Sequence, residues 1–242
     1  MTHLKLTIEY DGTDFSGWQS QANGRAIQDV IESAVAQVTG EKIRIHGAGR
    51  TDAGVHASGQ VASLTLGADV DPLQLRGSIN GVLPDDVVIL NAELVPESFH
   101  ARFSAVSRRY RYVIHRGPSA LDRRTEWSVG WQLNTSYLMK SAEMFLGRHN
   151  FRSFSKTGSD VRDWMCDIHR SEWKELGSSL EYTVQANRFL YGMVRALVGT
   201  MVEVARSHRP ITDISSILEA EDRGAAGMAA PAHGLTLVEI TY

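Results

Sequence analysis

Apolar and polar residues alternate from the first residues of the chain onward. Four apolar side chains occupy every second position near the start: Leu4, Leu6, Ile8 and Tyr10. This period of two is typical of a strand with one buried face. Further strands are predicted at 42–46, 61–66, 87–90, 109–114, 168–174, 180–186 and 235–240. A chain with so many half-buried strands must fold around a sheet.

Segments with helical spacing of apolar residues lie between these strands. They predict helices over 27–38, 72–79, 136–146 and 190–205. The mixed order indicates an α+β protein. The pattern lapses near 99–106, so we predict two similar domains, 1–104 and 105–242. Each is expected to be a mainly antiparallel mixed sheet backed by helices, with a central active-site cleft.

Composition is that of an ordinary globular protein, with 43% hydrophobic and 22% charged residues. The single cysteine, Cys166, excludes an intrachain disulfide and a thiolate zinc site. The first residues do not resemble a signal peptide, and no stretch reaches membrane-spanning length. These features predict a soluble cytoplasmic protein that does not bind a membrane.

Positive charge is concentrated in the middle of a chain whose formal net charge is −3. Residues 102–124 contain seven arginines and one acidic residue, Asp122. Arg109 and Arg111 of this run are candidate contacts for RNA phosphates. A run of arginines is also common on the solvated face of a strand, so charge alone leaves both interpretations open.

Three glycines surround Asp52 in the segment GAGRTDAGVHA, 47–57. Glycine permits close backbone approaches, so a tight loop after a strand can present the carboxylate at a sheet edge. Arg50 and His56 flank Asp52. On spacing alone, an aspartate between glycines is more often a turn or capping residue than a catalytic one.

The run from Gly49 to Ala57 resembles the signature of tRNA pseudouridine synthases of the A type, the TruA family. Other segments resemble motifs of this family in the same order, and they are spread across most of the chain. They are YDGT at 10–13, GWQ at 17–19, FHARFS at 99–104, RYRY at 109–112, MVR at 193–195 and APAHGL at 230–235.

This resemblance implies an isomerase that converts uridine to pseudouridine at positions 38, 39 and 40 in the anticodon stem-loop of tRNA. It further implies a homodimer, with one tRNA spanning both subunits. Asp52 would be the nucleophile, Arg195 its ion-pair partner, and Tyr110 the residue that receives the extruded base. Arg50 would help to hold the flipped nucleotide.

Isomerisation of uridine involves no redox change and no group donor. The sequence accordingly contains no GxGxxG motif after a strand, no P-loop and no HExxH motif, and its nine histidines lack metal-ligand spacing. We therefore expect no cofactor and no metal. The sequence leaves open whether the carboxylate attacks the sugar or the base.

Two other functional classes compete with this interpretation. One is a non-catalytic RNA-binding protein, and the other is a small-molecule glycoside-type isomerase or hydrolase, which usually needs paired carboxyl groups. Trp18, Phe99 and Phe103 are expected to pack in the core or between the domains rather than to stack on RNA.

Overall fold

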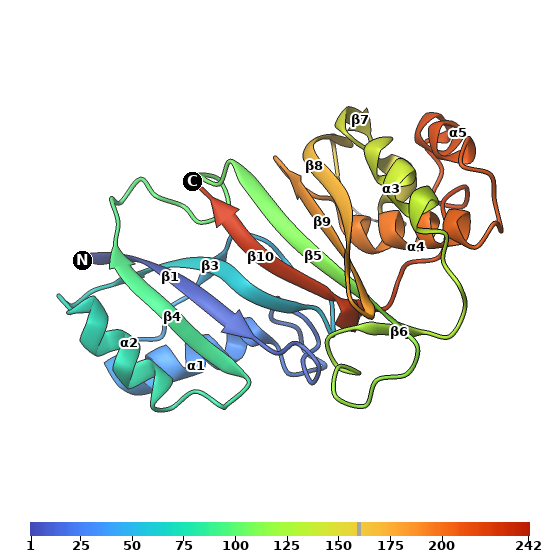
Figure 1. Ribbon diagram of the computed structural model, residues 1–242. Coiled ribbons are helices and arrows are strands. Elements are labelled where there is room, and N and C mark those ends of the chain that lie inside the picture. Colours follow the sequence, from blue (N-terminus) through green and yellow to red (C-terminus); the bar gives the residue numbers. More distant parts are fainter. Residues whose placement is uncertain (159–160) are drawn as a thin grey trace. The chain divides into compact units, whose positions relative to one another are not determined.

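The protein is an α+β structure of mostly antiparallel strands backed by helices (Figure 1), which confirms the predicted fold class. The computed structural model describes residues 1–158 and 161–242. The chain divides into two compact units, 1–106 with 236–242, and 107–235. The predicted ranges 1–104 and 105–242 differ from these units chiefly in the C-terminal segment. Two similar domains with a cleft between them remain a prediction.

The first unit has the strand order β4-β1-β3-β10. Its strands are β1 (Thr2–Tyr10), β2 (His46–Gly47), β3 (His56–Leu66), β4 (Val87–Leu94) and β10 (Leu235–Thr241). β1 pairs antiparallel with both β3 and β4, and β2 pairs antiparallel with β3. β10 is parallel to β3, with Thr236 opposite His56. The chain end thus lies beside the strand that follows the Asp52 loop.

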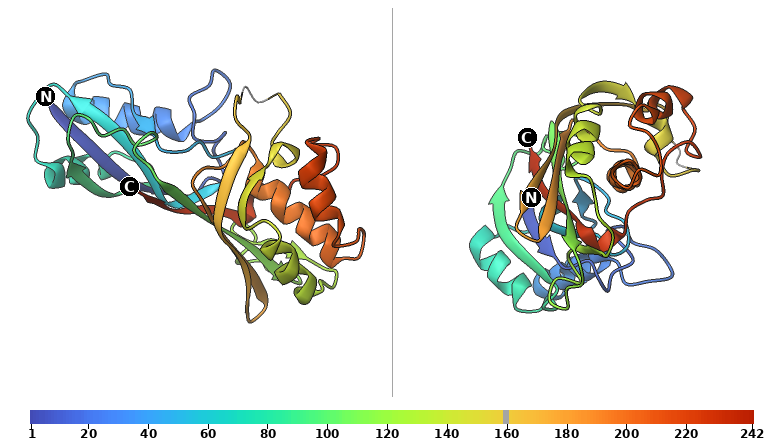
Figure 2. Two further views of the ribbon diagram at one scale, coloured as in Figure 1. Left: turned by 90° about the horizontal axis from the view of Figure 1, so that it is seen from above. Right: turned by 45° about the vertical axis from the view of Figure 1, so that its right-hand side comes forward.

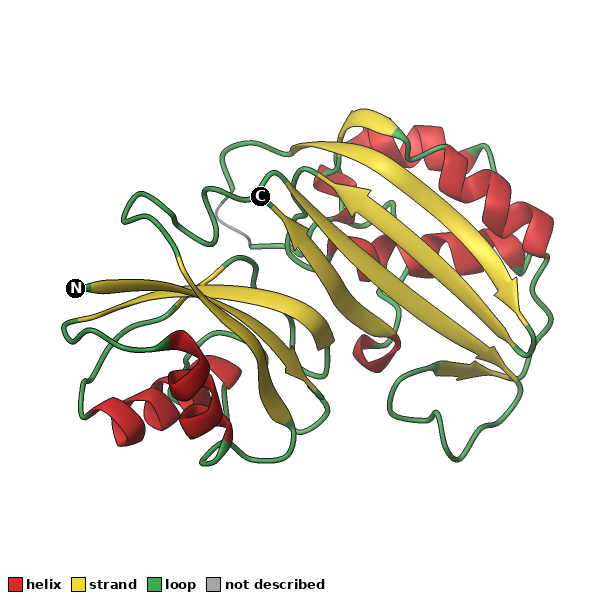
Figure 3. Cartoon of the chain, turned by 60° about the vertical axis from the view of Figure 1, so that its left-hand side comes forward, coloured by secondary structure: helices red, strands yellow, loops and turns green. Residues whose placement is uncertain are grey.

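Helices α1 (Ile27–Thr39) and α2 (Pro72–Asn80) lie on one side of these strands (Figure 3). α1 buries Ile27, Ile31 and Val35, which recur one turn apart along its length. It ends at Gly40, whose φ of 75° suits a residue without a side chain. Asp71 caps α2 by accepting hydrogen bonds from two backbone N–H groups.

The second unit has the strand order β5-β9-β8-β7, with every neighbouring pair antiparallel. These strands are β5 (Ser107–Arg116), β7 (Gly147–Asn150), β8 (Met165–Leu176) and β9 (Ser179–Ala186), and β6 (Trp127–Val129) pairs parallel with β5. The helices are α3 (Thr135–Glu143), α4 (Met193–Ala205) and α5 (Asp213–Ala220), with short 3-10 turns at Arg152–Phe154 and Ala232–Gly234. α3 and α4 lie beside each other against the strands (Figures 1 and 2).

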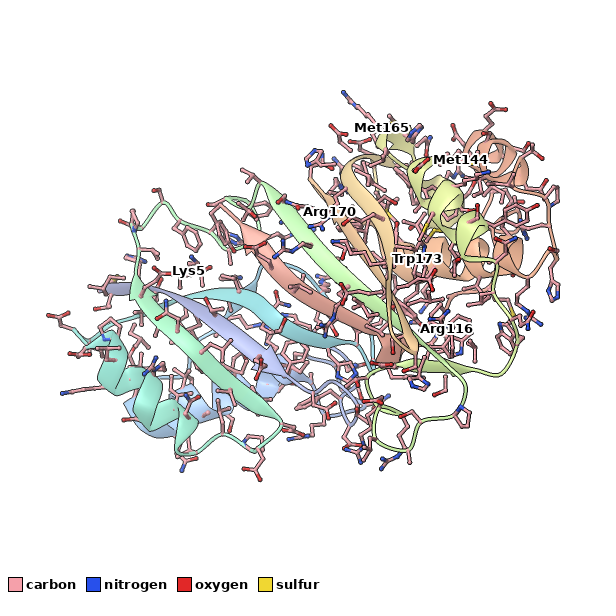
Figure 4. All side chains as sticks on the ribbon, in the orientation of Figure 1. Lys5, Arg116, Met144, Met165, Arg170 and Trp173 are labelled. Atoms are coloured by element: carbon pink, nitrogen blue, oxygen red, sulfur yellow. The ribbon has the colours of Figure 1, made fainter. Side chains whose placement is uncertain are left out.

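A side chain of β8 meets α4 in the core of the second unit. Trp173, labelled on β8 in Figure 4, stacks on Tyr182 with ring centroids 5.1 Å apart. Its indole N–H donates to the sulfur of Met201 at 3.3 Å. α4 is buried on nearly all sides, as expected for a helix whose apolar residues extend round its surface.

Three local predictions are wrong, and three short elements were not predicted. The predicted helix at 136–146 ends at Glu143. Residues 41–45 form no strand, and only the short β2 follows them. The predicted helix at 190–205 begins at Met193, because Gly192 has a left-handed φ of 71°. The pattern also gave no sign of β6, β7 or α5, which are short. Among the described residues, no helix has the length and apolar character needed to cross a membrane.

Candidate active site

Asp52 is half-buried on the loop that joins β2 to β3. The segment that follows β1 holds this loop by backbone hydrogen bonds. The N–H of Trp18 donates to the carbonyl of Thr51 at 3.1 Å, and the N–H of Gly54 donates to the carbonyl of Phe15 at 3.4 Å. The backbone on either side of Asp52 is therefore fixed by residues more than thirty positions away in the sequence.

Close contacts explain the glycines of both segments. Gly17 has φ 103°, and a Cβ atom there would lie 2.7 Å from the carbonyl oxygen of Thr51. A Cβ atom at Gly12 would overlap the carbonyl of Val55. The loop and the 10–18 segment thus pack backbone against backbone, which leaves no room for side chains at these points.

Buried polar contacts brace the base of the loop. The hydroxyls of Tyr10 and Thr51 are 2.8 Å apart in a buried hydrogen bond. The side-chain amide of Gln60 donates to the carbonyl of Gly49 at 2.8 Å. Because Gln60 is fully buried, this bond satisfies a group that would otherwise be costly to bury.

His56 is a further brace. It is 5% exposed, and its Nδ1 accepts from the N–H of Gly12 at 3.1 Å. The same Nδ1 lies 3.1 Å from a carboxylate oxygen of Asp11, which also accepts from the N–H and hydroxyl of Thr13. One ring nitrogen cannot accept from Gly12 and donate to Asp11 at once, so the position of the ring hydrogen decides which of these bonds forms. Arg50, in contrast, is exposed.

Strand β5 carries three candidate residues of the second unit on two opposite faces. Tyr110 is 8% exposed, and its ring meets Phe189 edge-on at 5.1 Å. Tyr112, on the same face, is fully buried and donates its hydroxyl to the carbonyl of Pro231 at 2.9 Å. Arg109 and Arg111 alternate with these tyrosines, so their side chains leave the other face of the strand.

Arg111 is open to solvent, with 48% of its side chain exposed and its guanidinium 3.9 Å from a carboxylate oxygen of Glu181. Arg109 is half-buried. The contact with Glu181 is at the limit of an ion pair on the surface, where such pairs contribute little to stability. Both arginines therefore belong to the solvent side of β5.

Arg195 is the third residue of α4 and is half-buried. Its Nε donates to the carbonyl of Ala230 at 2.7 Å, and the N–H of Ala230 donates back to the carbonyl of Arg195 at 2.9 Å. Burial raises the pKa of Tyr112, while the nearby charge of Arg195 acts in the opposite direction. The RYRY, MVR and APAHGL segments therefore meet within the second unit.

A second cation lies beside the start of α4. Lys156 places its Nζ 4.7 Å from the ring centroid of Tyr191 and 3.2 Å from its hydroxyl. The backbone N–H of Lys156 donates to the carbonyl of Tyr191 at 2.8 Å. Sequence reasoning missed this pair because its two residues are distant in the chain and neither stands in a charged run.

The candidate residues divide between the two units. Asp52 and Arg50 belong to the first, whereas Tyr110, Arg109, Arg111 and Arg195 belong to the second. The second unit brings Tyr112 and Arg195 close together, and it separates Tyr110 from the neighbouring arginines. The pairing of Asp52 with Arg195 stays a prediction.

One set of potential metal ligands occurs among the described residues: His115, Asp122 and Glu126, whose ligand atoms lie within 4.8 Å of one another. Neighbouring groups account for their positions. Nδ1 of His115 bonds to the carbonyl of Gly117 at 2.9 Å, and the two carboxylates accept from Ser119 and Ser179, each at 2.7 Å. We assign no ion to this set, and the absence of a metal stays a prediction.

An α+β chain with a carboxylate on a braced glycine loop fits an enzyme that uses its own side chains as reagents. Comparison with known proteins gives the family. The chain matches the model for tRNA pseudouridine synthase over residues 6–104 and 141–242. It is 41% identical over 245 residues to the tRNA pseudouridine synthase A of Ruminiclostridium cellulolyticum, with 100% of both chains covered. The enzymes of that name from Acetivibrio thermocellus and Afipia carboxidovorans are each 40% identical, again with 100% of both chains covered.

The chain therefore belongs to the tRNA pseudouridine synthase family, whose members are isomerases. This confirms the resemblance seen in the sequence motifs and the predicted enzyme class.

Proposed function

We propose that the protein isomerises uridine to pseudouridine at positions 38, 39 and 40 in the anticodon stem-loop of tRNA. The observation that carries this proposal is the similarity, along the full length of the chain, to enzymes named tRNA pseudouridine synthase A. Asp52 is the proposed nucleophile, because it stands in the segment that resembles the family signature. A homodimer with one tRNA spanning both subunits belongs to the same proposal.

The reaction exchanges one bond for another without oxidation. The bond between N1 of uracil and C1′ of ribose breaks, the uracil turns, and C5 bonds to C1′. C5 then loses its proton, and N1 gains one. A carboxylate serves this sequence by forming a covalent adduct with the sugar or the base. Water has no part in it, so a closed pocket protects the detached uracil until it is recaptured.

The braced loop supports this role for Asp52. A nucleophile held within a fraction of an ångström of its productive position avoids much of the entropic cost of the reaction. Hydrogen bonds to Thr51 and Gly54 and the contacts of Gly17 supply that fixed position. Asp11 does not supply a second free acid at the base of the loop, because its carboxylate already accepts from the N–H and hydroxyl of Thr13.

Arg195 is the proposed partner that keeps Asp52 ionised as the substrate excludes water. The bond from its Nε to Ala230 fixes the plane of the guanidinium. In the proposed complex the other N–H groups of the guanidinium donate to the Asp52 carboxylate. A planar cation held in this way loses little side-chain entropy when it pairs with a carboxylate.

Tyr110 is the proposed contact for the extruded base. Because only 8% of its surface is exposed, its ring cannot serve as an open stacking platform in the described position. A hydroxyl needs a much smaller opening than a ring face. We therefore favour a contact through the hydroxyl, which is also the group able to accept the C5 proton.

Arg109 and Arg111 are proposed to bind RNA phosphates. Since they leave the opposite face of β5 from Tyr110, the phosphates they bind lie away from the reacting uridine. Their removal should thus weaken binding without changing the chemical step. Arg50, exposed and two residues before Asp52, is proposed to hold the flipped nucleotide.

Release of tritium from tRNA labelled at C5 of uridine tests the nucleophile. Asp52→Ala and Asp52→Asn should lower the rate by roughly 10⁴-fold or more, since each removes the attacking group. Both variants should bind tRNA within about threefold of wild type. Asp85→Asn is the control, because it makes the same chemical change at an exposed turn residue. Retained turnover in both Asp52 variants would rule out Asp52 as the nucleophile.

The same assay separates the competing classes. A non-catalytic RNA-binding protein would bind tRNA without releasing tritium. A small-molecule isomerase or hydrolase would act on free uridine and leave tRNA unchanged. Either result for the wild-type protein contradicts the proposed function.

A further inference from the structure

An exposed phenylalanine marks the turn that follows β4. Phe103 has 77% of its surface exposed, although its sequence context predicted packing in the core or between domains. That prediction is wrong for Phe103, whereas Trp18 is 3% exposed and lies in the core. Burying a phenylalanine stabilises a protein by roughly 1.5–3 kcal/mol. The first unit forgoes this stabilisation at Phe103.

The turn that presents Phe103 is tightly hydrogen-bonded. The N–H of His100 donates to the hydroxyl of Ser104 at 3.0 Å, and the N–H of Ser104 donates to the carbonyl of His100 at 2.9 Å. Nδ1 of His100 accepts from the N–H groups of Arg102 and Phe103 at 3.1 and 3.4 Å. Phe103 is therefore exposed by a defined turn rather than by a loose loop.

The base of this turn is tied to the sheet. The N–H of Ala101 donates to the hydroxyl of Ser63 on β3 at 3.1 Å. The hydroxyl of Tyr242 donates to the carbonyl of Ala101 at 2.9 Å. Ala101 itself is fully buried. These contacts hold the turn in one position before any partner binds.

Aromatic rings and a cation surround Phe103. The ring of His100 lies 4.5 Å from that of Phe103, and the ring of His46 lies 5.2 Å from that of His100. The guanidinium of Arg102 is 5.7 Å from the Phe103 ring. Burial and the neighbouring His46 lower the pKa of His100, which agrees with its Nδ1 accepting hydrogen bonds. The surface thus combines flat rings with a positive charge.

We propose that Phe103, backed by His100 and flanked by Arg102, is a stacking site for an unpaired nucleobase of the substrate RNA. Every base has a π-face, and stacking on an aromatic side chain contributes about 1–3 kcal/mol per base. Arg102 supplies the charge that an adjoining phosphate requires. An apolar patch alone would suit a protein partner. Aromatic rings beside a cation suit RNA, which has both flat bases and negatively charged phosphates.

This inference rests on the proposed RNA substrate and adds a contact outside the Asp52 loop. Bases in a duplex are already stacked on their neighbours, so the occupant is a looped or unpaired nucleotide. The site holds RNA rather than reacting with it. Its loss should therefore raise KM and Kd and leave kcat unchanged.

Phe103→Ala and Phe103→Tyr, assayed with an intact tRNA substrate, test the site. Phe103→Ala should weaken binding by at least about fivefold, the lower end of the stacking range. Phe103→Tyr should restore binding because it keeps the ring. Leu121→Ala is the control, since Leu121 is 92% exposed and apolar but has no aromatic neighbour in the described contacts. The melting temperature should not change in any of these variants.

Phe103→Trp adds a direct signal. Its emission, taken as the difference from the wild-type protein with its five tryptophans, should be quenched when tRNA is added. Unchanged binding in Phe103→Ala, or no quenching in Phe103→Trp, overturns the stacking site. A change in the mass of Phe103→Ala by sedimentation, with unchanged RNA affinity, also overturns it and makes the patch a contact between copies of the chain.

The two proposals fail in different ways. Wild-type tritium release together with unaltered RNA binding by Phe103→Ala removes only the stacking site. Quenching of Phe103→Trp by tRNA without wild-type tritium release supports the stacking site and removes only the isomerisation.

Discussion

The Asp52 loop and strand β5 hold their candidate residues in opposite ways. The loop lies against the 10–18 segment, so that Gly17 touches the carbonyl of Thr51 and the hydroxyl of Thr51 meets Tyr10. β5 is a regular strand whose partner β9 fixes its backbone and leaves Arg111 exposed. Neighbours thus constrain the loop on several sides, whereas β5 has one open face.

In the proposed function, this difference separates the chemical step from RNA affinity. A reacting carboxylate must be positioned within a fraction of an ångström, and the backbone contacts around Asp52 suit that need. A phosphate contact tolerates movement because charge acts over several ångströms. Substitutions beneath the loop should therefore reduce turnover, and substitutions on the open face of β5 should reduce only binding.

Gly17→Ala should have the largest effect among the substitutions that spare Asp52 itself. A methyl group there meets the Thr51 carbonyl at 2.7 Å and must also adopt φ 103°. We expect a loss of stability of about 1–3 kcal/mol from backbone strain. Displacement of the loop should lower tritium release by about 100-fold or more. Thermal unfolding and single-turnover assays measure the two effects.

Gly40→Ala is the matched control. Gly40 also has a positive φ, 75°, but a Cβ atom there meets nothing within 4 Å. It should show a similar backbone cost with turnover within about twofold of wild type. If Gly17→Ala behaves like Gly40→Ala, contact with the loop does not position Asp52, and the contrast with β5 disappears.

Thr51→Val should have an effect between those of Gly17→Ala and Arg111→Gln. It keeps the shape of the side chain and removes the hydroxyl that bonds to Tyr10. A buried hydrogen bond contributes about 1 kcal/mol, and an unsatisfied partner costs about 1–3 kcal/mol. A double-mutant cycle with Tyr10→Phe should give a coupling energy near 1 kcal/mol in denaturant unfolding. Additive single effects would show that this bond does not brace the loop.

Regular elements with strong periodicity were predictable from the sequence. β1, β5 and β9 follow the period of two, and α1 follows helical spacing up to Gly40. Each of these elements buries one face, so the regular spacing of its apolar residues can be read in the sequence. Arg109 and Arg111 alternate with Tyr110 and Tyr112 on β5 with the same period.

Contacts between distant segments could not be predicted. Gly12 and Gly17 are required because the 47–57 loop passes close to them, which no local pattern records. The left-handed conformation of Gly192 makes α4 shorter than predicted, and residues 42–45 show apolar alternation without a strand. The prediction for Phe103 was also wrong. An apolar residue of this kind is expected to be buried, whereas a hydrogen-bonded turn exposes Phe103.

The candidate site residues are predicted from motif resemblance rather than from physical pattern. Spacing favoured a turn role for Asp52, and only the match over Gly49–Ala57 raised the nucleophile to the preferred interpretation. Tyr10 and His56 are among the residues that hold the Asp52 loop in place. Nothing in their sequence context indicated this role. A buried tyrosine at the end of a strand is ordinary until the structure places Thr51 beside its hydroxyl.

Arg111→Gln should have the smallest effect of these substitutions. It tests most directly whether the exposed face of β5 binds RNA. Stability should change by less than about 0.5 kcal/mol, because the side chain is exposed and its ion pair with Glu181 is long. Affinity for tRNA should fall about two- to fivefold, and the slope of log Kd against log salt should decrease by about 0.7–0.9, the share of one phosphate. Unchanged kcat would agree with a role in binding alone.

Arg116→Gln removes the same charge from the last residue of β5, where Arg116 bonds to Glu175 and to the carbonyl of Gly177. If both variants lower the salt slope equally, tRNA responds to the overall charge of the strand. If only Arg111→Gln lowers it, RNA contacts the part of β5 next to Tyr110. A fall in kcat for Arg111→Gln would contradict the division between a positioned loop and a tolerant strand, since an exposed cation would then influence the chemical step.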